Sequence, residues 1–418
     1  MKILVVGSGA REDAICKALL KNDSNTVFCA PGNDGMKLSG IKTISINEDE
    51  FDHLTNFVQT NDIDYTIVGP EEPLVNGIVD FFKERKLKIF GPNKLAAQVE
   101  GSKTFTKKVM ADANIPTANY REFTNLENAI EYLTVESSFP TVIKADGLAA
   151  GKGVYIVQNL DDALEVVSEL LDGHKFNTKR VVIEEYLEGE EFSLMAFVDH
   201  KRFYPMPLAQ DYKKIFEDDK GPNTGGMGAV CPVSNISEDI RQMAIDQVLK
   251  PFVHQLYQEG IKYTGILYAG LILTKDGIKV IEFNARFGDP ETEVVLPRLK
   301  SDLSDIFVKI LNHKKITEIN WETKGLNLGV FAVSQGYPQK PIFGSLGKVD
   351  DFKNCPLTIN FAAVRKQDDE LISNGGRLYL MQTQADSLSH AQADVYQHLQ
   401  RMNQENIFYR RDIGKNSI

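Results

Sequence analysis

The first hundred residues alternate short apolar runs with amphipathic stretches, and this alternation limits the possible folds more than any other feature of the chain. The expected strands are residues 2–6, 27–30, 65–68 and 88–90, and the expected helices are 12–21, 51–60 and 78–86. Strands that alternate with helices predict a doubly wound parallel sheet. Turns rich in glycine, proline and acidic residues follow its strands at 7–12, 31–33 and 69–73. Parallel sheets bind ligands at this edge, so we expect a small ligand there.

Two later changes of pattern predict further domains, because 418 residues are too many for one core. The elements expected after residue 116 are strands at 141–145, 154–157 and 180–184, a helix near 161–171, a loop at 209–232, a helix at 240–259, strands at 268–274, 279–284, 327–334 and 378–384, and a closing helix. Pro251 should kink or split the helix that contains it. We predict an α/β domain over 1–103, a central domain over 104–325 with a lid over about 119–187, and a C-terminal domain over 326–418.

Composition argues against several classes of function. The net charge is −11 and no block of basic residues occurs, which disfavours a nucleic-acid binder. The four cysteines form no CxxC pair, so neither a disulfide framework nor a cysteine zinc site is indicated. No stretch approaches about 20 apolar residues, and the first residues do not form a signal peptide. We expect a soluble cytoplasmic protein that does not contact a membrane.

Residues 144–153 place lysines and glycines between two expected strands. Glycines let backbone N–H groups approach phosphate oxygens closely, and Lys144 and Lys152 add positive charge. The glycine spacing and the following strand differ from a Walker P-loop. The simpler alternative is a flexible hairpin tip. The strand at 181–184 then runs into an acidic linker, 185–191, which could contact adenine and ribose or could be a solvated turn.

The segment 280–291 carries the most chemical information. On a strand, Glu282 and Asn284 point to the same face and offer two oxygen ligands suited to Mg²⁺. Arg286 offers a planar fork for a carboxylate or phosphoryl group. The simpler alternatives are an asparagine satisfied by the backbone, and an ion pair of Arg286 with Asp289 or Glu291. Upstream, the charged and glycine-rich loop within 210–228 could pass beneath a substrate.

Together, residues 147–153, 184–191, 210–228 and 282–291 resemble the ATP-grasp superfamily and, within it, the family of phosphoribosylamine–glycine ligases. The segments follow the family order over essentially the whole chain, and the strings GPNTGGMGA and EFNARFGDPE are highly specific. The resemblance implies an ATP-grasp core with a small lid and a β-rich C-terminal domain. It also implies a purine-biosynthetic reaction in which glycine and ATP form glycyl phosphate, which the amine of 5-phosphoribosylamine then attacks.

The resemblance assigns roles residue by residue. The nucleotide-binding positions are Lys103, Lys144, Gly151, Lys152, Gly153, Glu184, Leu187 and Glu191. The metal ligands, for Mg²⁺ or Mn²⁺, are Glu282 and Asn284. The substrate-binding positions are Gly9, Arg11, Glu12, Asp211, Arg286, Gly288 and Asp289, and the catalytic candidates are Lys152, Asp211, Lys213 and Arg286. The implied partners are ATP, glycine and 5-phosphoribosylamine, in a monomer or weak homodimer.

Four positions depart from the usual family pattern. Asp13 and Tyr212 stand where histidine is usual, Lys214 replaces an arginine, and Ala10 replaces a glycine. Three other functions stay open: another ligase or a carboxylase of the superfamily, a regulator that binds nucleotide without turnover, and a dinucleotide-dependent oxidoreductase. The last is suggested by the glycines at 7 and 9, although Glu12 stands where its fingerprint needs glycine or alanine.

Overall fold

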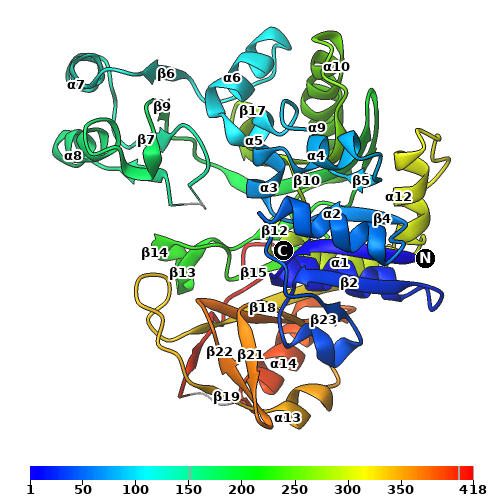
Figure 1. Ribbon diagram of the computed structural model, residues 1–418. Coiled ribbons are helices and arrows are strands. Elements are labelled where there is room, and N and C mark those ends of the chain that lie inside the picture. The colour runs from blue at the N-terminus through cyan, green and yellow to red at the C-terminus, as the bar shows by residue number, and fades with distance from the viewer. Residues whose placement is uncertain (150–151, 403–404, 418) are drawn as a thin grey trace.

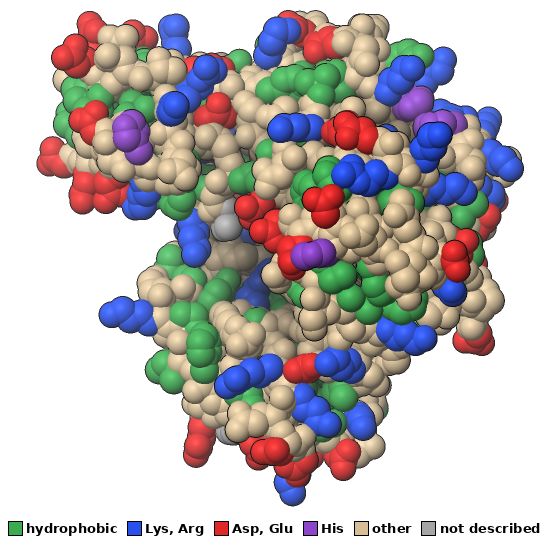
Figure 2. All heavy atoms as spheres, viewed as in Figure 1, with side chains coloured by type: hydrophobic (Ala, Val, Ile, Leu, Met, Phe, Trp, Pro, Cys, Tyr) green, Lys and Arg blue, Asp and Glu red, His purple; other side chains and the backbone are tan. Residues whose placement is uncertain are grey.

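The computed structural model describes residues 1–149, 152–402 and 405–417. Its parts surround a central pair of sheets, with the lid projecting at the upper left of Figure 1 and the C-terminal strands lying below. Figure 2 shows the surface hollowed between these two lobes. The α/β prediction, with a parallel N-terminal sheet and a β-rich C-terminal part, is confirmed.

The N-terminal sheet has the order β3-β2-β1-β4-β5, and all its strands are parallel. Its strands are β1 Lys2–Gly7, β2 Thr26–Pro31, β3 Lys42–Thr43, β4 Tyr65–Val68 and β5 Ile89–Phe90, and its helices are α1 Ala10–Leu20, α2 Phe51–Thr60, α3 Glu71–Asn76, α4 Ile78–Glu84 and α5 Gln98–Gly101. Within β1, Leu4 and Val6 pack into one core and Ile3 and Val5 into another. Because alternate side chains are buried on both faces, the doubly wound prediction holds.

The lid is a four-stranded antiparallel sheet with the order β6-β9-β7-β8. Its elements are β6 Tyr120–Phe123, α7 Leu126–Val135, β7 Thr141–Ala145, β8 Val154–Val157, α8 Leu160–Leu171 and β9 Val181–Glu185. It has a small core of its own, to which both helices contribute. Helix α6, Lys103–Asp112, precedes it and joins it to the N-terminal part.

The central sheet has the order β11-β10-β16-β17. Its strands are β10 Glu190–Asp199, β11 Arg202–Pro205, β16 Thr264–Thr274 and β17 Gly277–Asn284, and the helices beside it are α9 Glu238–Ala244, α10 Lys250–Gln258, α11 Glu291–Val295 and α12 Leu303–Leu311. The predicted kink at Pro251 takes the form of a π-helical turn, Ile245–Leu249, between α9 and α10. The wider turn accommodates a residue that lacks a backbone N–H.

The C-terminal part contains a sheet with the order β12-β15-β18-β23-β20, with β24 also paired to β18. The remaining elements are β12 Gln210–Asp211, β13 Lys214–Phe216, β14 Lys220–Asn223, β15 Gly228–Cys231, β18 Leu326–Ser334, β19 Ser345–Lys348, α13 Val349–Lys353, β20 Thr358–Phe361, β21 Val364–Gln367, β22 Glu370–Ser373, β23 Arg377–Ala385, α14 Leu388–Leu399 and β24 Ile407–Phe408. The prediction of a loop over 209–232 was wrong, since this segment holds four short strands. Two of them, β12 and β15, belong to the C-terminal sheet.

The domain boundaries after residues 103 and 325 stay a prediction. Limited proteolysis would test them, because boundaries fall in exposed linkers that few contacts cross. Among the helices that the structure describes, none combines the length and the apolar character that spanning a membrane requires.

Candidate active site

Glu184 on β9 is buried between two lysines. Its Oε2 lies 2.7 Å from Nζ of Lys144 on β7, and its Oε1 lies 2.9 Å from Nζ of Lys107 on α6. Burial alone would raise the pKa of this carboxyl, but the two ammonium groups outweigh burial and hold the pKa below its ordinary value. Lys144 also donates to the carbonyl of Ile281 on β17, at 3.1 Å. The lid and the central sheet therefore meet at this cluster of charges.

The glycine loop is tied to the start of α6 by Asp146. The Asp146 carboxylate accepts from the backbone N–H of Lys103, at 2.6 Å, and from the hydroxyl of Thr104, at 3.1 Å. Lys103 donates its ammonium to the carbonyl of Gly147, at 3.0 Å. Burial lowers the pKa of Lys103, against the opposing effect of Glu282. Lys103 is thus a cation held at the mouth of the loop.

The remaining nucleotide-binding candidates lie on the loop and on the linker. The carbonyl of Gly153 accepts from the N–H of Ala145, while the Lys152 side chain is exposed at the loop tip. Gly151 lies outside the described residues. Leu187 is half-buried on the linker after β9, and Glu191 lies at the start of β10.

Glu282 and Asn284 lie on the same face of β17, as predicted. Their side chains touch, with Asn284 Nδ2 3.2 Å from Glu282 Oε1. Burial would raise the pKa of Glu282, but the ammonium groups of Lys213 and Lys144 hold the pKa below its ordinary value. The strand thus presents an ionised carboxylate and an amide oxygen, the oxygen ligands that Mg²⁺ prefers.

Lys213 and two carboxylates face this pair from the neighbouring strands. Lys213 Nζ lies 3.0 Å from Oε2 of Glu191 and 3.6 Å from Oδ1 of Asp211. Burial raises the pKa of Asp211 to about 7, although Lys213 opposes the rise. For Lys213, burial lowers the pKa, but Asp211 and Glu191 outweigh it and raise the pKa well above its ordinary value. The ammonium of Lys213 is therefore a permanent charge of the site.

Arg286 follows β17 and is held by two carboxylates of the N-terminal part. Its Nη2 lies 2.9 Å from Glu100 Oε1, and its Nε lies 3.4 Å from Glu71 Oε2. The sequence-based alternative, a pair with Asp289 or Glu291, is wrong for this arginine. Its pKa would fall on burial, but these two carboxylates raise it. The guanidinium is fixed at the junction of two sheets.

The turn after β1 reaches the same junction. Arg11 donates to the carbonyl of Phe287, at 3.3 Å, and its Nε lies 2.5 Å from Glu12 Oε1. Glu12 Oε2 in turn accepts from the N–H of Gly9, at 2.7 Å. A Cβ at Gly69 would lie 2.0 Å from Glu12 Oε1, so glycine is required there. The Glu12 carboxylate accepts from the backbone N–H of Gly9. A dinucleotide pyrophosphate would need that donor, which argues against an oxidoreductase.

Gly288 and Asp289 complete the loop after β17. A Cβ at Gly288 would lie 2.5 Å from Glu291 Oε2, which leaves room only for glycine. Asp289 Oδ2 lies 2.7 Å from Nη2 of Arg377 on β23. The C-terminal part therefore contributes a charged side chain to the edge of the site.

Models of the phosphoribosylglycinamide synthetase N, ATP-grasp (A) and C domains match residues 1–100, 101–292 and 327–416. The chain is 47% identical over 422 residues to the phosphoribosylamine–glycine ligase of Lactococcus lactis subsp. lactis, with 100% of both chains covered. The chain belongs to the phosphoribosylglycinamide synthetase family. A second relative of the same name, from Streptococcus pneumoniae serotype 4, is 47% identical over 421 residues, again with 100% of both chains covered.

Solved structures give the same fold. The phosphoribosylamine–glycine ligase of Thermotoga maritima matches with a TM-score of 0.85 and 31% identity, covering 99% of this chain and 100% of that one. The biotin carboxylase domain of the Hydrogenobacter thermophilus 2-oxoglutarate carboxylase matches with a TM-score of 0.75 at 14% identity, over 97% and 91% of the two chains. At that identity the second likeness concerns the ATP-grasp fold alone.

The departures from the usual phosphoribosylglycinamide synthetase pattern have structural roles. Asp13 accepts from Lys17 Nζ, at 2.8 Å, and from the N–H of Phe361 on β20, at 2.6 Å. The Tyr212 hydroxyl lies 2.8 Å from Ser417 Oγ. Ala10 is the first residue of α1 and does not have the positive φ that would favour glycine. Asp13 therefore joins α1 to the C-terminal sheet, Ala10 packs in the core of the C-terminal part, and Tyr212 binds a residue near the end of the chain.

Replacing Asp13 by alanine should destabilise the protein. The N–H of Phe361 and the ammonium of Lys17 would lose a charged partner, and hydrogen bonds to charged groups are worth about 1.5–3 kcal/mol each. We expect a lower urea midpoint, with kcat/KM changed by less than about threefold because Asp13 is not among the residues proposed to bind ATP or substrate. Asp23→Ala, an exposed aspartate after the same helix, is the matched control. Equal midpoints for the two variants would contradict this role.

Several residues of the site were not predicted. Lys107 lies one helical turn after Lys103, and that four-residue spacing was a usable signal for a second lysine on the same face. Glu71 stands in the turn at 69–73 that was expected to lie near a ligand, but nothing in the sequence indicates that Glu71 and Glu100 pair with Arg286. Arg377 is far along the chain from Asp289 and carries no local signal.

Glu100 should make stability depend on pH. Burial raises its pKa to about 7, and Arg286 offsets only part of the rise. A carboxyl whose pKa is raised by folding stabilises the fold below its ordinary pKa, and this contribution is lost as the pH rises through about 7. We expect urea unfolding at about pH 5 and 7.5 to show a smaller pH dependence for Glu100→Gln than for the unchanged protein. Glu136→Gln, an exposed control, should leave the pH dependence unchanged.

Proposed function

We propose that this protein ligates glycine to 5-phosphoribosylamine with ATP, giving glycinamide ribonucleotide, ADP and phosphate in purine biosynthesis. The relatives named phosphoribosylamine–glycine ligase match it over their whole length. The observation that carries the proposal is the position of Arg286. It follows the strand that bears Glu282 and Asn284, and it pairs with Glu71 and Glu100 from the N-terminal part. The residues proposed to bind the metal would therefore adjoin those proposed to bind the amine.

The first step needs positioning and charge neutralisation rather than a nucleophilic side chain. An oxygen of the glycine carboxylate attacks the γ-phosphorus of ATP, the bond to the β–γ bridging oxygen breaks, and ADP leaves. We propose that Lys103, Lys144 and Lys152 hold the phosphates, and that Glu184, Leu187 and Glu191 hold the nucleoside.

The second step forms the amide bond. The nitrogen of phosphoribosylamine attacks the carbonyl carbon of glycyl phosphate, inorganic phosphate leaves, and the nitrogen loses a proton. Gly9, Arg11 and Glu12 are proposed to bind the phosphoribosylamine, and Asp211, Lys213, Gly288 and Asp289 the glycyl end. Arg286 lies between these groups and can stabilise charge in both steps.

We propose Glu282 and Asn284 as ligands of Mg²⁺ or Mn²⁺. Their oxygens suit either ion, and the ionised state of Glu282 fits a dication. When bound, the ion supplies neutralisation of the phosphate charge. The structure of the Hydrogenobacter carboxylase domain is described as a complex with MgADP, which supports a metal in this fold.

ADP release against a panel of carboxylates and amines tests this function. We expect full turnover only with glycine and phosphoribosylamine together, and formation of glycinamide ribonucleotide by mass spectrometry. Equal rates with other amino acids or with bicarbonate would contradict the glycine assignment. ATP binding without turnover would instead identify a regulator.

A further inference from the structure

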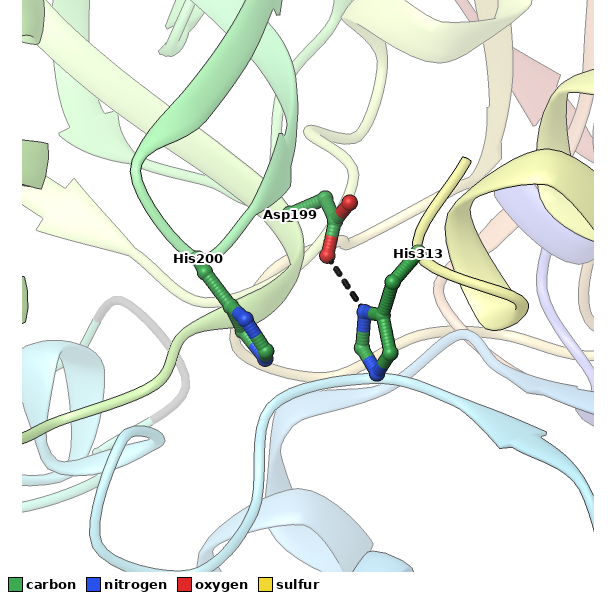
Figure 3. Close-up of side chains that lie close together, drawn as sticks. All are labelled: Asp199, His200 and His313. Atoms are coloured by element: carbon green, nitrogen blue, oxygen red, sulfur yellow. Dashed lines mark hydrogen bonds and ion pairs between the residues drawn. The ribbon is translucent and has the colours of Figure 1, made fainter. Parts of the chain in front are cut away.

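Asp199, His200 and His313 lie close together (Figure 3), with Asp199 buried, His200 half-buried and His313 exposed. Asp199 ends β10, His200 lies in the turn to β11, and His313 lies just beyond α12. One ligand atom of each lies within 4.8 Å of the others. Strand β10 starts near the nucleotide site at Glu190, so the cluster is about 30 Å from that site along the strand.

We propose that this cluster binds one transition-metal ion of the class of Zn²⁺, Co²⁺ and Ni²⁺. Two imidazole nitrogens and a carboxylate oxygen form a typical set of three protein ligands for such ions, with water in the remaining position. Mg²⁺ and Ca²⁺ prefer oxygen ligands, so the cluster would differ in selectivity from the pair Glu282 and Asn284.

The side chains are already close to a binding arrangement. Asp199 Oδ1 lies 2.7 Å from His313 Nδ1, and the two imidazole centroids lie 4.4 Å apart with 32° between the ring planes. Two ligands, each about 2.1 Å from a tetrahedral ion, lie roughly 3.4 Å from each other. The aspartate and histidine atoms therefore need to separate by less than about 1 Å to admit an ion between them.

Both histidines have an unusual backbone conformation. His200 and His313 have φ values of 56° and 53°, in the left-handed region. Histidine tolerates this region better than branched residues do, and such backbone is common at functional sites. Figure 3 shows the two rings on either side of Asp199.

Arg202 fixes the arrangement from outside. Its Nη2 lies 2.5 Å from Asp199 Oδ2 and donates to the backbone carbonyl of His313, at 2.6 Å. The arginine thus joins the turn after β10 to the segment after α12 and orients the carboxylate. The positive charge of Arg202 also balances the negative charge of Asp199, so the carboxylate alone attracts a cation weakly. We therefore expect only ions with strong affinity for imidazole to bind.

A Co²⁺ titration of the full-length protein tests the proposal. With saturating Mg²⁺ and ADP to occupy the active site, we expect one Co²⁺ per chain, visible absorption bands typical of a nitrogen- and oxygen-bound ion, and displacement by Zn²⁺. Loss of a residue that only hydrogen-bonds a metal ligand weakens metal binding by roughly 10–100-fold, and we expect Arg202→Gln to weaken Co²⁺ binding by that amount. His200→Asn and His313→Gln each remove a ligand and should weaken Co²⁺ binding at least as much.

The matched control is His254→Gln, an exposed histidine on α10, which should bind Co²⁺ like the unchanged protein. Failure of the unchanged protein to bind Co²⁺ or Zn²⁺ would overturn the proposal. Equal binding by the double variant of His200 and His313 would also overturn it. Either result would leave the cluster as an ion pair between Asp199 and His313. Because Mg²⁺-dependent turnover is measured separately, failure here would not affect the proposed ligase function.

Discussion

Replacing Arg286 by alanine should lower kcat by about three orders of magnitude or more, the range found for arginines that stabilise a transferring phosphoryl group. The guanidinium is held by Glu100 and Glu71 at the end of the strand that carries Glu282. Its fork suits a phosphoryl or carboxylate group, which an ammonium matches poorly. Coupled ADP release at saturating ATP, glycine and phosphoribosylamine measures the effect. Arg286→Lys should recover only a small part of it.

A second substitution separates catalysis from folding. Arg286→Ala leaves the Glu100 carboxyl buried without its partner, and breaking such a pair costs about 3–5 kcal/mol of stability. Adding Glu100→Gln replaces this carboxyl by a neutral amide and should restore part of the urea midpoint. Turnover should stay low in the double variant. Recovery of turnover together with stability would show that Arg286 only supports the fold.

Replacing Glu282 by alanine should lower kcat by about 100- to 1,000-fold, as expected when one group that stabilises charge in the transition state is removed. The residue is the ionised member of the pair on β17, beside Lys213 and Lys144. We also expect a higher Mg²⁺ concentration at half-maximal rate. Glu282→Gln keeps an oxygen but loses the charge, so its kcat should lie between that of the unchanged protein and that of Glu282→Ala. An unchanged Mg²⁺ dependence in both variants would contradict a ligand role.

Much of the fold followed from local patterns. The alternation of strands and helices in the first hundred residues predicted the doubly wound sheet, and the same-face placement of Glu282 and Asn284 followed from strand periodicity. Both depend on neighbours within a few residues. The residues that hold Arg286 could not be predicted in this way, because Glu71 and Glu100 meet it only after two separate sheets pack together.

The structure of residues 209–232 could not be predicted because it depends on a distant strand. Glycine and charge in this segment suggested a loop, yet β15 pairs along β18, about a hundred residues later. A strand of four residues has almost no periodicity to detect, and its stability comes from the partner strand. Three of the four departures, Ala10, Asp13 and Tyr212, are similar, since their partners lie in distant parts of the chain.

The pairing of β15 with β18 also limits how this protein can be divided. A fragment that ends before residue 326 would retain β15 but lose the strand beside it, leaving a row of unpaired N–H and C=O groups. Such an edge recruits other chains, so the truncated fragment would aggregate or require the missing piece in trans. A gene split at this point would therefore encode two halves that depend on each other for solubility, although each contains most of a domain.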